Sequence, residues 1–296
     1  MIKRLLDLES DKNGLSTIFH IIIILLIFFL SQLIGGVIVD SIYKLTRLFG
    51  VKSTINLRTL NVTLRCIFEI GLFYLSTHYY VTKILKLNMS YFRITKPRFS
   101  LLWVVIAFLL PLAVITYYFV FTNGTISYIR SESLLLYIAY ALKLGLTAGI
   151  TEEFLFRGFI MKLVERRWSK KIAIIIPSII FASFHLIKGM GSVDIVLLLM
   201  SGITVSVMFS LITYLNENIW GAAIMHIIWN TLILGIFYIS PQSNLQNIVN
   251  YIFDNNNILI TGGRFGIESG IPAIMSYTVV IIVILVLLRK RDRELV

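Results

Sequence analysis

The chain has 296 residues, of which 57% are hydrophobic, and its mean hydropathy is +0.87. This composition is far too apolar for a soluble domain and indicates an integral membrane protein. The formal net charge of +12 does not indicate a nucleic-acid partner, because Lys and Arg fall largely in tails and short loops, as the positive-inside rule expects. The single cysteine, Cys66, excludes an internal disulfide and a CxxC metal site.

Eight apolar segments come close to the roughly 17–25 residues that cross a bilayer as a helix. In chain order they are residues 18–39, 62–81, 101–121, 134–164, 172–187, 195–215, 219–239 and 271–288. The second is interrupted by three polar residues, and the fifth is short and carries Pro177, so we expect it to be kinked. The sequence therefore predicts an all-α polytopic membrane protein with about eight transmembrane helices, forming a single membrane domain over residues 1–296.

Both termini are predicted to lie in the cytoplasm. In that orientation the inside segments carry 17 Lys and Arg and the outside loops carry 7, which is the expected asymmetry. Four of those seven lie in the first outside loop, and the rule does not account for them. Residues 241–270 contain Asn- and Gly-rich pieces and are predicted to form an extracytoplasmic loop, with a short surface helix around residues 245–253.

Only three of the fifteen acidic residues lie within the predicted spans, namely Glu69, Glu152 and Glu153. Charged side chains at membrane depth are costly and usually mark a functional site. Glu69 follows Arg65 by four residues, so the two are expected to neutralise each other on one helix face. Lys143 has no obvious partner in the sequence.

The Glu152–Glu153 doublet is predicted to divide into two roles. Glu153 and Arg157 are four residues apart and are expected to form an internal ion pair. Glu152 points about 100° away from Glu153 on a helix, so it must find a partner on another helix, hold water or become protonated. This asymmetry makes Glu152 the candidate reactive carboxylate, although a purely structural charge cluster remains an alternative.

Two later spans supply further polar side chains. His185 ends the sequence FASFH, with Phe181 one turn before it, and His226 and Asn230 in HIIWN share one helix face. A single membrane histidine more often joins helices by a hydrogen bond than takes part in catalysis. However, at about 1.5 Å of rise per residue these groups and Glu152 all reach the middle of a core roughly 30 Å thick. We therefore predict one site built by the fourth, fifth and seventh spans.

At these residues the chain resembles the CPBP family of intramembrane proteases, which includes CAAX prenyl endopeptidases and bacteriocin-processing and immunity proteins. The resemblance covers residues 134–239, the predicted catalytic core of spans four to seven, and Gly202 looks like the family's glycine in the sixth span. The family pattern EExxxR, FxxxH and HxxxN is complete here as Glu152-Glu153…Arg157, Phe181…His185 and His226…Asn230.

The resemblance implies that Glu152 is the catalytic glutamate and that His185 helps it to hold and activate a water molecule. His226 and Asn230 would steady the oxyanion, with Glu153 and Arg157 as a supporting pair. The implied activity is endopeptidase cleavage of a membrane-associated peptide or protein within the lipid bilayer, without a cofactor.

Three alternatives remain. A zinc-dependent version would use Glu152, His185 and His226 as ligands, but the chain has no HExxH motif and no clear second carboxylate to act as base. Some relatives act as non-catalytic scaffolds or bacteriocin self-immunity proteins, although motif-degenerate chains suit that role better. A proton-coupled transporter would explain buried Glu and His, but no inverted repeat supports it.

The composition also bears on location. The high content of Ile, Asn and Lys is typical of an AT-rich bacterial genome. We therefore expect a multi-pass protein of the bacterial plasma membrane, for which a bacterial peptide is a better substrate candidate than a prenylated CAAX protein.

Overall fold

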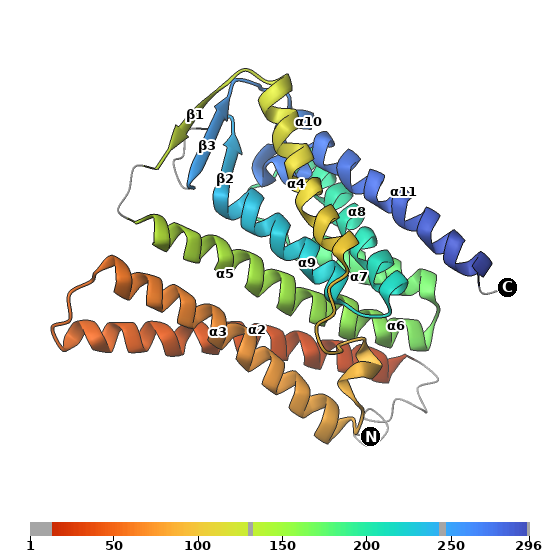
Figure 1. The fold of residues 1–296 in the computed structure, drawn as a ribbon. Coiled ribbons are helices and arrows are strands. Elements are labelled where there is room, and N and C mark those ends of the chain that lie inside the picture. Colours follow the sequence, from red (N-terminus) through yellow and green to blue (C-terminus); the bar gives the residue numbers. More distant parts are fainter. Residues whose placement is uncertain (1–13, 130–132, 243–246, 295–296) are drawn as a thin grey trace.

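The computed structural model describes residues 14–129, 133–242 and 247–294, and most of them are helical. Five helices are long and apolar enough to cross a membrane (Figure 1). They are α2 (Leu15–Leu48), α4 (Leu101–Phe121), the continuous helix Leu134–Arg167, α8 (Ser192–Asn216) and α11 (Ile271–Glu294). The predicted all-α membrane fold is confirmed.

The other three predicted spans are also helical, but each is shorter or less apolar than those five. Residues 62–81 lie mostly in α3 (Ile55–Tyr79), and residues 172–187 mostly in α7 (Lys170–Ser183). Residues 220–236 of the seventh predicted span are helical, in α9 (Trp220–Trp229) and η4 (Asn230–Ile236), but its last residues, 237–239, belong to strand β2 (Phe237–Ser240). The structure thus gives a helix for each of the eight predicted segments, while length and composition identify five as membrane-crossing.

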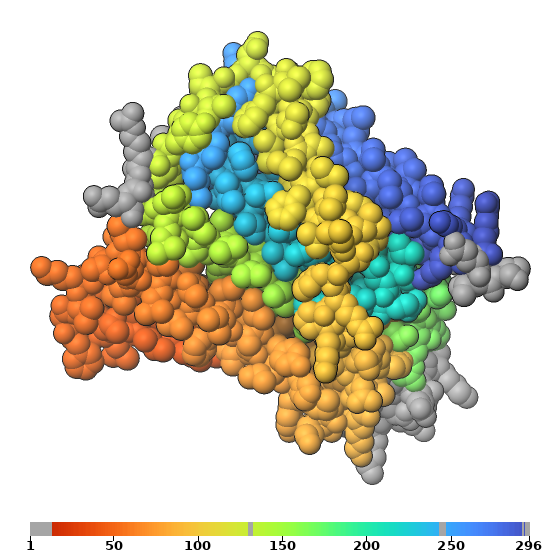
Figure 2. All heavy atoms as spheres, viewed as in Figure 1, coloured from red at the N-terminus to blue at the C-terminus, as the bar shows by residue number. Residues whose placement is uncertain are grey.

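Helices α2 and α3 form a hairpin along one flank of the molecule, coloured red to orange in Figures 1 and 2. A network of ion pairs around the buried Glu69 joins it to the rest of the fold. Glu69 accepts from Arg65 at 2.8 Å, as predicted, and its second oxygen lies 2.9 Å from Nζ of Lys143 on α5. Asp40 on α2 completes the network, 3.3 Å from Arg65. The charges of two acidic and two basic side chains on three helices therefore neutralise one another. The partner of Lys143 is Glu69, which lies on a different helix.

The continuous helix is composed of α5 (Leu134–Glu153), a wider π-helical segment η3 (Phe154–Ile160) and α6 (Met161–Arg167). A second π-helical segment, η4 (Asn230–Ile236), follows α9 without a break. Each widened segment lies beside a predicted site residue: η3 begins directly after Glu153, and η4 begins at Asn230. Single π turns inside α-helices are frequent at functional sites.

A small three-stranded sheet caps the end of the bundle at which α5 begins (Figure 1). Its strands are β1 (Gly124–Tyr128), β2 (Phe237–Ser240) and β3 (Val249–Phe253), in the order β1-β3-β2. β3 pairs antiparallel with β1 and parallel with β2. The predicted surface helix is therefore wrong over residues 249–253, where Val, Tyr, Ile and Phe favour a strand; residues 243–246 lie outside the described part.

The chain returns from the sheet to the bundle through short helical turns. These are α10 (Ile258–Thr261), η5 (Gly263–Phe265) and η6 (Ile267–Ser269), which lead directly into α11. Between α3 and α4 the chain forms η1 (Tyr80–Ile84) and η2 (Met89–Phe92). Phe265 of η5 and Glu268 of η6 line the cavity described below.

The segments predicted to face the cytoplasm meet at the other end of the bundle. Arg93 donates to Glu165 at 2.7 Å, and Arg291 donates to the carbonyl oxygen of Tyr214 at 3.2 Å. The connections after α3, α6 and α8 and the last turns of α11 are therefore neighbours in space. The N-terminal tail of the predicted topology falls within residues 1–13, outside the described residues.

Candidate active site

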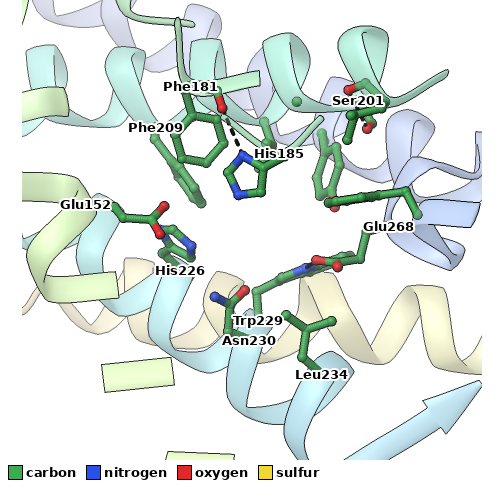
Figure 3. A pocket seen from close by; sticks show the side chains of 15 residues that line it. Glu152, Phe181, His185, Ser201, Phe209, His226, Trp229, Asn230, Leu234 and Glu268 are labelled. Carbon is green, nitrogen blue, oxygen red and sulfur yellow. Dashed lines mark hydrogen bonds between the residues drawn. The ribbon is translucent and has the colours of Figure 1, made fainter. Parts of the chain in front are cut away.

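A cavity of about 330 Å³ lies between α5, α7, α8 and α9, and the segment from η5 to α11 closes it (Figure 3). It brings together the four side chains that the sequence analysis assigned to catalysis and Phe181, while Glu153 and Arg157 lie outside its lining. Its lining is otherwise mostly apolar. The lining residues are Glu152, Phe181, His185, Leu198, Ser201, Gly202, Val205, Phe209, His226, Trp229, Asn230, Leu234, Phe265, Glu268 and Tyr277.

The two adjacent carboxylates have different surroundings. Glu153 is fully buried: its Oε1 accepts from Nδ1 of His226 at 2.9 Å, and its Oε2 lies 3.2 Å from Nε of Arg157. The predicted ion pair is present, and its link to His226 is additional. Glu152 lines the cavity, and its Oε2 has no hydrogen-bond partner among the described residues. Both oxygens of Glu153 thus contact charged or imidazole groups of the protein, whereas Glu152 lies at the cavity wall and its buried Oε2 has no such contact among the described residues.

Arg157 is completely buried, which requires its charge to be compensated. Besides the carboxylate of Glu153, it contacts Oγ of Ser206 on α8 at 2.9 Å. Its guanidinium carbon also lies 4.8 Å from the ring centre of Phe181 and 5.1 Å from that of Phe209. Electrostatic attraction to the two ring faces further stabilises the cation, so the Glu153–Arg157 pair is rigidly held.

The two histidines have one ring nitrogen each engaged by the protein. Nδ1 of His185 lies 2.8 Å from the carbonyl oxygen of Phe181 and must donate to it, since a carbonyl only accepts. His226 Nδ1 donates to the ion-paired carboxylate of Glu153, and its ring stacks on Phe209 with centroids 5.2 Å apart. These contacts fix both rings and leave Nε2 of each as the second site for proton exchange.

One prediction about His185 needs correction. The sequence analysis placed it within a helix over residues 172–187, but α7 ends at Ser183. Phe184 and His185 instead form a turn, in which the amide of His185 bonds to the carbonyl oxygen of Ala182. His185 still reaches the cavity because its ring packs on Phe181, at 4.8 Å between centroids.

Glu268 and Trp229 are cavity residues that sequence reasoning missed. Nε1 of Trp229 donates to Oε1 of Glu268 at 2.7 Å, and Glu268 lies across the cavity from Glu152 (Figure 3). Burial raises the pKa of the Glu268 carboxyl, and the Trp229 hydrogen bond acts in the opposite direction. Trp229 could have been found as the neighbour of Asn230, whereas Glu268 lies in a segment read only as a loop.

The donor set was also tested against the zinc alternative. Within the described ranges, no three His, Cys, Asp or Glu side chains come close enough to hold a metal ion. The predicted zinc ligands Glu152, His185 and His226 all line the cavity but do not form such a group. The arrangement of the described residues does not fit a three-ligand zinc site.

Comparison with known proteins identifies the segment that carries these motifs. Residues 134–232 match the family described as Type II CAAX prenyl endopeptidase Rce1-like. This match supports the predicted resemblance to the CPBP/CAAX protease family. The match covers about a third of the chain and ends before β2, so it contains Glu152, His185, His226 and Asn230 but not Glu268. A comparison with curated proteins gave no match.

Proposed function

We propose that this protein is an intramembrane endopeptidase in which Glu152 activates a water molecule for attack on a peptide bond. One observation carries the proposal: Glu152 lines a mostly apolar cavity and has a carboxylate oxygen without a partner among the described residues, while both oxygens of Glu153 contact Arg157 or His226. A carboxylate within hydrogen-bond reach of a bound water molecule can act as its general base. The substrate is a membrane-associated peptide or protein.

His185 and Glu152 together hold the attacking water. His185 donates through Nδ1 to the protein, so its neutral ring offers a lone pair at Nε2. A water molecule between this nitrogen and Glu152 would be oriented by both and would lose its proton to the carboxylate as it attacks. The same proton is then delivered to the departing amine, which leaves Glu152 ionised for the next cycle.

His226 and Asn230 stabilise the negative oxygen of the tetrahedral intermediate. Asn230 contributes an amide N–H, and His226 contributes an imidazolium N–H when both ring nitrogens carry protons. The charge balance supports a protonated His226, because Glu153 and Arg157 already cancel each other. The positive ring would then compensate the negative charge of Glu152 in the same cavity.

The proposal is tested by replacing Glu152 with the isosteric Gln. The wild-type protein and the Glu152→Gln variant are expressed separately in cells from which the protein's own gene has been deleted. The peptides in the membranes of the two strains are then compared by mass spectrometry. Peptides produced by the wild-type chain should be missing with Glu152→Gln, and should persist with the matched control Glu217→Gln, whose side chain is 68% exposed in an ion pair far from the cavity.

Purified protein in liposomes then separates chemistry from binding. Cleavage of an identified substrate should survive a strong zinc chelator and should be abolished by Glu152→Gln. Full activity of Glu152→Gln would refute the glutamate mechanism. An unchanged peptide profile together with an unchanged cellular phenotype would favour a non-catalytic scaffold or immunity protein, and loss of activity with the chelator would favour zinc.

A further inference from the structure

A second hollow, which the proposed mechanism does not use, adjoins the catalytic cavity. This groove has a volume of about 430 Å³ and lies between β2 and the segment Gly263–Glu268. Three residues line both hollows, namely Leu234, Phe265 and Glu268. The groove therefore lies between the sheet end of the molecule and the cavity, and Glu268 borders both.

β2 borders the groove with an unpaired edge. In the described part of the chain, the strand order β1-β3-β2 leaves one side of β2 without a neighbouring strand. The consecutive residues Tyr238, Ile239 and Ser240 all line the groove, although successive side chains of a strand point to opposite faces. The groove thus runs along the edge of the strand and not over one face of it.

The backbone of this edge is available for pairing. The carbonyl oxygen of Phe237 accepts from the Asn247 side chain at 3.1 Å, so the open stretch begins at Tyr238. Across the described residues, no backbone hydrogen bond joins residues 238–240 to residues 261–268 on the other side of the groove. An exposed strand edge is a template for an added strand, and many proteins bind extended peptides in this way.

Glu268 gives the junction a chemical preference. Only one of its oxygens has a partner, Nε1 of Trp229, and among the described residues it has no ion pair. The groups around it include His185 and His226, the phenol of Tyr277 and, at i−4, Arg264, whose guanidinium instead donates to the carbonyl oxygen of Gly189. A carboxylate without an ion-pair partner is stabilised most by a cationic group of a bound ligand, which forms a charge-assisted hydrogen bond with it.

We propose that the groove holds an extended segment of the substrate paired along β2, and that Glu268 selects a Lys or Arg side chain in that segment. This proposal rests on the endopeptidase function, since it assigns the substrate's path to that site. It makes Glu268 a specificity residue and not part of the water-activating machinery. The substrates would then be basic peptides that approach from the sheet end of the molecule.

The test uses binding in place of cleavage, so that it does not depend on the chemistry. Full-length Glu152→Gln protein in liposomes is titrated with fluorescent decapeptides that carry Lys, Arg, norleucine or Glu at one scanned position. Lys and Arg peptides should bind about tenfold or more tightly than the norleucine peptide, the ratio expected for a charge-assisted hydrogen bond. N-methylation of alternate backbone amides should weaken binding, because it blocks strand pairing.

Second substitutions in the same background assign the effect. Glu268→Gln should remove the preference for Lys and Arg, Glu268→Lys should shift it to the Glu peptide, and Glu217→Gln should leave it unchanged. Absence of binding, or a basic preference that survives Glu268→Gln, overturns the proposal. If the peptides bind with this pattern but the wild-type chain does not cleave them, the groove proposal stands and the endopeptidase function is rejected. If the wild-type chain cleaves them without a preference for Lys or Arg, the endopeptidase function stands and the groove proposal is rejected.

Discussion

Glu152 and Glu153 are chemically identical neighbours, and only their contacts separate their roles. Glu153 is bonded to Arg157 and His226 and is fully buried, so its charge is compensated by fixed groups. Glu152, in contrast, lines the cavity and forms no ion pair among the described residues. Removing one partner of a buried ion pair is strongly destabilising, so we interpret Glu153 as a residue that holds His226 in place and not as a second base.

Asn230 provides a direct check on the oxyanion part of the mechanism. Its side chain lines the cavity one helical turn after His226 and is 9% exposed. If its amide donates to the intermediate, Asn230→Ala should lower kcat by about 10²–10³ with a much smaller change in KM, because that bond forms fully only in the transition state. Steady-state kinetics with an identified peptide in liposomes measures this.

The control for that experiment is Asn61→Ala, which removes a weak side-chain bond to the carbonyl oxygen of Val39, between α2 and α3. Its kcat should stay at the wild-type level. A kcat for Asn230→Ala that equals the wild-type value would show that the oxyanion is held elsewhere.

Individual residues differ in how far sequence could place them. Glu152, His185, His226 and Asn230 could be assigned to one cavity because few polar groups occur in apolar spans, and burial forces such groups together. The partner of Lys143 and the position of Glu268 could not be found, since both depend on contacts between helices far apart in sequence. Spacing rules such as i, i+4 describe only neighbours on one helix.

The interface between α5 and α9 sets the distance between the carboxylates and the imidazole of His226. A Cβ atom added to Gly149 would lie 2.5 Å from Cγ1 and 2.7 Å from the amide nitrogen of Ile227. Small residues at such positions let helix backbones approach closely. Because Gly149 precedes Glu152 by less than one turn and Ile227 follows His226, this contact holds two parts of the site together.

Gly149→Ala should therefore separate the helices and impair both stability and turnover. Overpacking of this kind typically costs about 1–3 kcal/mol. Thermal unfolding in detergent is monitored through the reaction of the buried Cys66 thiol with a thiol-reactive dye. The midpoint temperature of Gly149→Ala should be lower than that of the wild-type protein. In Gly71→Ala the new methyl group meets nothing within 4 Å, so the midpoint should be unchanged or higher, as for a helix glycine replaced by Ala. Equal midpoints for both variants would contradict this account.

For the molecule as a whole, hydropathy predicts the helical membrane fold well because every buried backbone group in a bilayer must be satisfied within a helix or a closed barrel. The same reasoning says little about the sheet. β1 and β3 are separated by more than a hundred residues, and each strand is only five residues long. Their pairing is a contact between distant segments that no local sequence pattern encodes.

The charge distribution also predicts the orientation of the protein in the membrane. Arg93, Glu165, Tyr214 and Arg291 meet at one end of the bundle, so a single orientation decides the side on which all four segments lie. The excess of Lys and Arg in the segments at that end predicts that it faces the cytoplasm.

Single cysteines in a Cys66→Ala background test this orientation. An impermeant maleimide added to intact cells should label Lys52→Cys and Lys188→Cys, and should label Lys96→Cys and Lys170→Cys only after the membrane is permeabilised; all four positions are exposed. The reverse pattern would invert the topology and place the groove beside β2 on the cytoplasmic side. Because basic peptides would then have to approach from the cytoplasm, the labelling also decides from which side the proposed substrates must come.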